Sequence, residues 1–303
     1  MARQSDQRRS DRDPGPRGEH ADVGTSGHEW DGIRELNNPL PRWWTWTFYA
    51  TIVFAIGYWV LYPSWPLINS YTEGVLGHSQ RAEVMQAIAS AQAAQSGLRQ
   101  AVLQSSLEEI RQDGDLSQFA IAGGRSAFAV NCSQCHGQGA QGSAGYPNLN
   151  DDSWLWGGSL EAIETSIRFG IRSDHPETRL NDMTAFGTLD ILSREEIADV
   201  AAHVLALSGQ TAADGFDQAA AERGAVVFAE QCVACHGPAG TGDRELGAPD
   251  LTDALWLYGG DRGSIIESVT NGRAGVMPAW IDRLDEVTVK QLAVYVHALG
   301  GGE

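Results

Sequence analysis

Sulfur-containing side chains are scarce in this chain, which has four cysteines and four methionines among its 303 residues. All four cysteines belong to two short motifs, so none is left over for a disulfide. Lysine is nearly absent, since Lys290 is the only one among 21 basic residues, and its scarcity suggests genomic composition more than function. Acidic residues number 39, which gives a net charge of −18. This acidic balance disfavours nucleic acid as a partner.

The cysteines lie in two copies of one pentapeptide, 100 residues apart: Cys132-Ser133-Gln134-Cys135-His136 and Cys232-Val233-Ala234-Cys235-His236. The C-x-x-C-H pattern is the covalent attachment signature of c-type haem. Its two thiols lie one helical turn apart and can bond one edge of the porphyrin, while the histidine supplies an axial nitrogen to the iron. A thioredoxin-like redox pair and half of a zinc site are the alternatives, and the repetition favours haem. The motifs therefore predict two covalent haems, with His136 and His236 as axial ligands.

Methionine is the usual sixth ligand of such an iron, with a second histidine as the other common choice. Met1 begins the chain and Met85 precedes both motifs, which leaves one methionine after each motif. We expect Met183 to complete the first iron and Met277 the second.

Histidines are the rival sixth ligands. His175 lies eight residues before Met183 and remains a candidate for the first iron. His203 and His297 fall on apolar helices and are interpreted as packing or surface residues.

Similarity between the two copies extends well beyond the motifs. Gly124 and Phe128 match Gly224 and Phe228 at an offset of 100, and further matches continue to the methionines, where the first copy carries about eight extra residues around 172–180. Each copy ends in an apolar-periodic helix, over 194–207 and 288–299. The fold predicted is all-α, with two tandem cytochrome c-like domains at 120–209 and 215–303. We expect Phe128 and Phe228, on first helices at 124–135 and 224–235, to pack on the terminal helix of their own copy. Trp154 and Trp256 are expected to line the haem pockets. Arg168, Arg172 and Arg273 could meet haem propionates, but solvated arginines on a helix are the default interpretation.

Residues 43–62 form an uncharged run of 20 residues with aromatic residues at both ends. At 1.5 Å per residue the run spans about 30 Å, the thickness of a bilayer's hydrocarbon core. A cleaved secretory signal is disfavoured because the run is too long and no A-x-A site lies directly after it. The run therefore predicts a single uncleaved transmembrane helix.

The orientation of this helix follows from its basic residues. Seven arginines precede the apolar run, and the first basic residue after it is Arg81. The positive-inside rule then places the N-terminus, residues 1–42, in the cytoplasm and the haem domains in the periplasm, with the helix in the bacterial inner membrane. Residues 1 to about 27 are expected to be a disordered tail.

Residues 63–119 connect the anchor to the first haem domain. Within them 78–112 shows one apolar stripe and predicts a helix, which could pair with a partner helix or lie along the first domain. Residues 1–42 hold seven arginines and eight acids, so the remaining chain carries −17 of the total −18. Such a field attracts basic soluble electron carriers.

The stretch from Glu29 to Trp44, EWDGIRELNNPLPRWW, followed by one anchor and two haem c domains, resembles subunit III of cbb3-type cytochrome c oxidases. The resemblance covers the chain from about residue 28 onward. The sequence departs from the family at Met183-Thr184, where Met-Pro is commoner. Proline stiffens the ligand loop, so with threonine there we expect a looser methionine bond at the first haem.

The resemblance implies a dihaem electron-transfer subunit of a proton-translocating terminal oxidase. It would accept electrons from a donor cytochrome c and pass them towards a monohaem cytochrome c subunit and the haem–copper catalytic subunit, which reduces oxygen. Two alternatives stay open. One is a freestanding membrane-anchored dihaem carrier, or the cytochrome subunit of a periplasmic dehydrogenase. The other is a dihaem peroxidase, which two complete His/Met sites disfavour.

Overall fold

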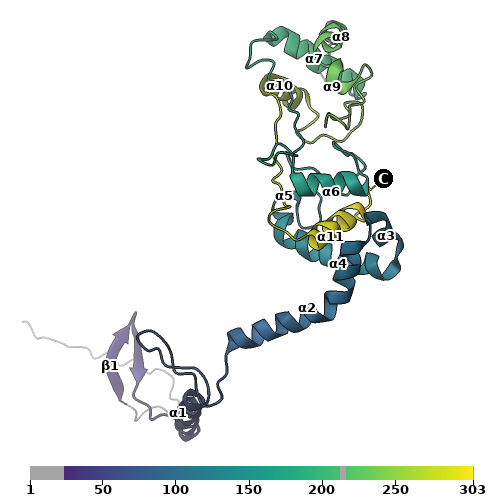
Figure 1. The fold of residues 1–303 in the computed structure, drawn as a ribbon. Coiled ribbons are helices and arrows are strands. Elements are labelled where there is room, and N and C mark those ends of the chain that lie inside the picture. Colours follow the sequence, from purple (N-terminus) through teal and green to yellow (C-terminus); the bar gives the residue numbers. More distant parts are fainter. Residues whose placement is uncertain (1–23, 212–215, 303) are drawn as a thin grey trace, which may run out of the picture. The chain divides into compact units, whose positions relative to one another are not determined.

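The structure is a computed structural model that describes residues 24–211 and 216–302. It contains two compact units, Met1–Ser90 and Ala91–Glu303, and each is taken by itself here (Figure 1). The disordered tail expected over residues 1 to about 27 lies almost wholly outside the described residues.

The first unit begins with a β-hairpin that the sequence analysis did not predict. Strands β1 (Thr25–Trp30) and β2 (Ile33–Leu36) pair in antiparallel fashion. Asp31 and Gly32 form the turn with φ angles of 48° and 85°. Two positive φ angles define the type I′ turn that Asp-Gly favours, so these two residues were themselves the missed signal.

The hairpin is followed by helix α1 (Arg42–Leu61). It starts one residue before the predicted run, and none of its side chains is buried. Within the described residues α1 is the one helix long and apolar enough to cross a membrane. A helix that exposes apolar side chains on every face needs a nonpolar surrounding.

The predicted helix over 78–112 is two helices, α2 (Gln80–Gln104) and α3 (Leu107–Gln112). Ser106 and Glu109 form a capping box that starts α3 and separates it from α2. Both elements enter the core of the second unit, since Val102 and Ile110 are completely buried. The single lysine, Lys290, donates hydrogen bonds to the carbonyl oxygens of 102, 103 and 105. It therefore satisfies the C-terminal end of α2.

The rest of the second unit consists of helices joined by loops, in line with the all-α fold expected. In chain order they are α4 (Gly114–Asn131), α5 (Ser133–His136), α6 (Leu160–Phe169), α7 (Arg194–Leu207), α8 (Gln218–Gln231), α9 (Val233–His236), α10 (Arg262–Asn271) and α11 (Glu286–His297).

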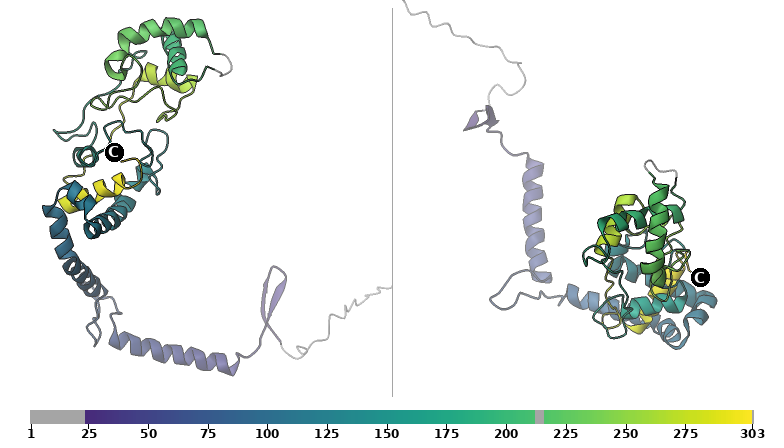
Figure 2. Two further views of the ribbon diagram at one scale, coloured as in Figure 1. Left: turned by 90° about the vertical axis from the view of Figure 1, so that its right-hand side faces the viewer. Right: turned by 90° about the horizontal axis from the view of Figure 1, so that it is seen from above.

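The first helix of each repeat packs on the terminal helix of the other repeat. Helix α4 packs on α11, and α8 packs on α7 (Figures 1 and 2). The expectation that each first helix lies on the terminal helix of its own copy is therefore wrong. We call the group α4, α5, α6 and α11 the first-motif half, and the group α7, α8, α9 and α10 the second-motif half.

The length of one connection explains this pairing. Helix α7 ends at residue 207 and α8 begins at 218, and helices joined by so short a link usually pack on each other. Pairing within each copy would send α8 away from its immediate neighbour. The second-motif half is thus one continuous stretch of chain, and the compact halves do not coincide with the segments 120–209 and 215–303.

Candidate functional site: two cysteine–histidine turns

Each C-x-x-C-H motif forms a separate helical turn at the end of a long helix. In the first motif α4 ends at Asn131, Cys132 breaks the helix and α5 carries Cys135 and His136. The second motif repeats this arrangement with α8 and α9. Gly137 and Gly237 end the short turns with φ angles of 81° and 72°. Both cysteines and the histidine of each motif therefore lie on one turn, as haem attachment requires.

Both histidines are oriented by the same hydrogen bond. The His136 Nδ1 atom is 3.1 Å from the Pro147 carbonyl oxygen, and the His236 Nδ1 atom is 3.1 Å from that of Pro249. An Nδ1–H that donates to a carbonyl leaves Nε2 with a free lone pair for a metal. Burial lowers the pKa of both imidazoles, which favours the neutral form that binds iron.

The thiols are unsuited to the alternative chemistries. Burial, assisted by the neighbouring second cysteine, raises the pKa of Cys132 and of Cys232 to about 11. A redox-active pair needs a thiolate at neutral pH. No group of three His, Cys, Asp or Glu side chains that could hold a metal ion occurs over residues 24–211 and 216–302. The structure thus favours haem attachment over a zinc site.

The two methionines pack near the motifs, but in crossed order. Met277 lies in the cluster that contains Phe128 and Cys132 of the first-motif half. Met183 lies with Phe228 and Cys232 of the second-motif half. We had expected Met183 at the first motif and Met277 at the second, so the structure brings each one to the other motif. Trp154 and Trp256 belong to the same two clusters, as expected of side chains near the haems.

Backbone hydrogen bonds join each methionine to a residue that lies shortly after the end of α6 or α10. Met277 exchanges two bonds of 2.9 Å with Ile171, which comes after α6. Met183 bonds with Arg273, after α10, at 3.0 and 3.3 Å. Gly170 and Gly272 precede these partners with φ angles of 72° and 69°. A Cβ atom at either glycine would collide with the methionine carbonyl, so only glycine permits this close approach.

The arginines that could meet haem propionates divide into two groups. Arg172 donates to the Gly275 carbonyl at 2.7 Å, and Arg273 donates to Ser268 Oγ at 2.9 Å, so protein groups already satisfy both. The Nε atoms of Arg168 and Arg179 are buried without a hydrogen-bond partner. Arg179 was not singled out from the sequence, because it lies in the extra segment of the first copy.

Arg179 fits a site that receives an anion. Its Nη atoms donate to the carbonyls of Trp156 and Ala162 at 3.0 and 3.2 Å, and its guanidinium lies 5.3 Å from the centroid of the Trp156 ring. Burial lowers its pKa, because desolvation disfavours the charged guanidinium more than the Glu245 carboxylate favours it. An unpartnered buried Nε beside α6 of the first-motif half matches the needs of a haem propionate.

Two of the rival histidines, His175 and His203, make other contacts. The Nδ1 atom of His175 accepts from the Glu177 backbone N–H at 3.1 Å, and its ring lies 4.9 Å from that of Phe169. His203 packs its ring 5.1 Å from Phe228, in line with the packing role expected, and His297 ends α11. Met277 is therefore better placed than His175 to serve the first motif.

Comparison with known proteins gives two family matches. Residues 22–69 match the N-terminal domain of cytochrome oxidase-cbb3, FixP. Residues 119–204 and 219–296 match cytochrome c oxidase, cbb3-type, subunit III. The chain belongs to the subunit III family of cbb3-type cytochrome c oxidases. Membership in this cbb3 family implies that the repeats bind haem c.

Individual relatives in the cbb3 family match nearly the whole chain. The cbb3-type cytochrome c oxidase subunit FixP of Bradyrhizobium sp. (strain ORS 278) is 53% identical over 279 residues, which are 92% of this chain and 95% of the relative. Subunit CcoP of Cereibacter sphaeroides is 51% identical over 280 residues, 92% of this chain and 95% of the relative. Together with α1, this similarity supports a membrane-anchored oxidase subunit.

Proposed function

We propose that this chain is the dihaem electron-transfer subunit of a cbb3-type cytochrome c oxidase, which receives electrons from a donor cytochrome c and passes them towards the haem–copper catalytic subunit. The observation that carries this proposal is the pair of matching turns, each with an oriented histidine and a partly buried methionine in the same cluster. Bound haem c would supply one reversible electron at each iron.

The chain's own residues would hold and tune these groups. Cys132 and Cys135, and in the second motif Cys232 and Cys235, would form the thioethers. His136 and His236 would give axial nitrogens, Met183 and Met277 axial sulfurs. The apolar clusters around Phe128 and Phe228 would exclude water, which keeps the change in solvation on electron transfer small.

Oxygen reduction and proton translocation would belong to partner subunits. A monohaem cytochrome c subunit would lie between this chain and the haem–copper subunit. Helix α1 would anchor the chain in the bacterial inner membrane, with the N-terminus in the cytoplasm and the haem repeats in the periplasm. The arginines before α1 and their absence until Arg81 support that orientation.

Purification of the tagged full-length chain from native membranes tests the proposal. We expect a haem–copper subunit and a monohaem cytochrome to co-purify, and a pyridine haemochrome assay to give two haems c per chain. A Cys232→Ala/Cys235→Ala variant should retain one. Two haems without an oxidase partner would indicate a freestanding carrier, and peroxide turnover by the purified chain would indicate a peroxidase.

A further inference from the structure

We propose that Trp156 and Tyr258 are positioning residues that lock the first-motif half to the second-motif half and so fix the separation of the two haem sites. The locking itself concerns only the protein. Its consequence, one fixed distance for electron exchange between the haems, rests on the proposed function.

The two aromatic residues occupy equivalent positions in the repeats, and each meets a glycine of the other repeat. Trp156 lies between α5 and α6, and Tyr258 lies between α9 and α10. A Cβ atom at Gly247 would collide with the Trp156 ring, and a Cβ atom at Gly145 would lie 3.5 Å from the Tyr258 ring. The two glycines are also equivalent in the repeats. The contacts are therefore reciprocal, as they are across a two-fold axis.

The backbone at both glycines suits this close approach. Gly145 and Gly247 have φ angles of 83° and 63°, which glycine adopts without strain. Hydrogen bonds flank both contacts. The Gly145 N–H donates to the Leu257 carbonyl at 2.9 Å, and the Asn181 side-chain amide donates to the Leu246 carbonyl. Each aromatic ring is thus seated on a loop that is itself held in place.

An arginine covers each ring. The guanidinium of Arg179 lies 5.3 Å from the centroid of the Trp156 ring, and that of Arg273 lies 4.2 Å from the centroid of the Tyr258 ring. Such cation–π contacts stabilise a ring in one orientation. Trp156 is only 8% exposed, yet it is absent from the hydrophobic clusters that the described residues form. Its burial therefore comes from the junction between the halves and not from either core.

The junction lies close to the axial histidines. Pro147 follows Gly145 by two residues, and Pro249 follows Gly247 by two. Their carbonyl oxygens make the hydrogen bonds that orient the His136 and His236 rings. Trp156 of the first-motif half thus presses on the loop that orients His236, and Tyr258 of the second-motif half contacts the loop that orients His136.

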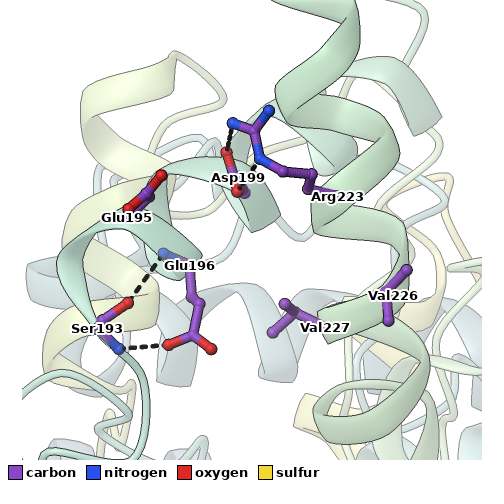
Figure 3. A pocket seen from close by; sticks show the side chains of 7 residues that line it. All are labelled: Ser193, Glu195, Glu196, Asp199, Arg223, Val226 and Val227. Atoms are coloured by element: carbon purple, nitrogen blue, oxygen red, sulfur yellow. Dashed lines mark hydrogen bonds and ion pairs between the residues drawn. The ribbon is translucent and has the colours of Figure 1, made fainter.

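Each half is fixed internally by contacts of its own. Asp199 on α7 accepts two hydrogen bonds from Arg223 on α8, of 2.8 and 2.6 Å (Figure 3). In the first-motif half, Gly123 of α4 makes room for the side chain of Gln291 on α11. Small domains of one chain move relative to each other unless their interface is large and apolar. The junction is therefore where freedom between the haem sites would arise, and the two rings remove it.

A pair of gadolinium labels tests the locking in the full-length chain. Ser126→Cys on α4 and Val226→Cys on α8 place the labels at equivalent, exposed positions, and double electron–electron resonance gives the distribution of distances between them. We expect one narrow distribution in the parent and a broad one in Trp156→Ala. Trp156→Phe should keep it narrow, and so should Leu180→Ala, a control whose side chain is 74% exposed beside Arg179.

Tyr258→Ala covers failure of Trp156→Ala to mature, and it should also broaden the distribution. A broad distribution in the parent would overturn the locking. So would a narrow one in Tyr258→Ala or Trp156→Ala.

Electron exchange between the haems tests the consequence. Cys132→Ala leaves the first haem with one thioether and one vinyl group, which moves its α-band to longer wavelength and distinguishes the two haems. After reduction by one electron, we expect a single rate of redistribution in this background. Trp156→Ala should replace it by a spread of slower rates, and Trp156→Phe should restore the single rate.

An unchanged single rate in Trp156→Ala would overturn the positioning role. A pyridine haemochrome assay keeps this result separate from the proposed function. Fewer than two haems in the parent would disprove the dihaem assignment, whereas the label distances would still decide whether the rings lock the halves.

Discussion

Replacement of Leu292 by alanine tests the packing of α11 without involving the haem ligands. Leu292 is 1% exposed and belongs to the core of the first-motif half. Truncation of a buried leucine costs about 3–5 kcal/mol, because apolar contacts are lost and a cavity remains. At about 3 kcal/mol, the population of locally open states of this half should rise about 150-fold.

Hydrogen–deuterium exchange followed by mass spectrometry measures this change helix by helix. We expect the protected amides of α4 to exchange about 150-fold faster in Leu292→Ala, and those of α8 to be unaffected. Val200 occupies the equivalent position on α7 and is also 1% exposed. Val200→Ala removes about two methylene equivalents, worth about 1.6 kcal/mol, and should accelerate exchange in α8 about 15-fold without affecting α4.

Val226→Ala is the matched control, because this α8 side chain is 61% exposed. Its effect should remain within about 0.5 kcal/mol. Faster exchange in α8 on truncation of Leu292 would refute the pairing of α11 with α4. So would faster exchange in α4 on truncation of Val200.

Three further predictions concern charge and topology. Arg179→Ala should lower the potential of the first haem by tens of millivolts in a redox titration, because a nearby cation disfavours the oxidised iron. Arg125→Ala, on the exposed face of α4, should change it little, and equal shifts would exclude the propionate contact. Reduction by a basic cytochrome c should slow steeply in stopped flow between 0.1 and 1 M salt, where the Debye length falls from about 10 to 3 Å. A rate independent of salt would mean apolar docking. Alkaline phosphatase fusions should be active after residue 75 and inactive before residue 42, and the reverse pattern would overturn the orientation.

The sequence was sufficient where function depends on short local patterns. The C-x-x-C-H spacing predicted both helical turns, and the uncharged run predicted α1 to within one residue. The Asp31-Gly32 hairpin was equally local and could have been found from its turn residues. Lys290 was attributed to composition, although it satisfies the carbonyl groups at the end of α2.

The exchange of terminal helices between the repeats was harder to predict. Pairing within each repeat and pairing across the repeats use the same helices and much the same apolar contacts. Repeats that resemble each other suggest self-contained domains, and domain exchange leaves little trace in the periodicity of either copy. The discriminating signals are a short α7–α8 connection and two unlike contacts, Asp199 with Arg223 and Gly123 with Gln291. Their meaning appears only when the helices are compared position by position across the repeats.

The pairing of α4 with α11 and of α8 with α7 also sets an order of assembly. Everything that closes the second-motif half lies between residues 183 and 273, so this half can fold as one segment while the remaining residues are still being synthesised. The first-motif half is split, with residues 114–171 at one end and 277–299 at the other, and it must close a loop of about 100 residues. The cysteines made first are therefore the last to be enclosed. A first haem attached early would stay uncovered until α11 arrives, and a chain that stops between the repeats would leave that haem without its covering helix.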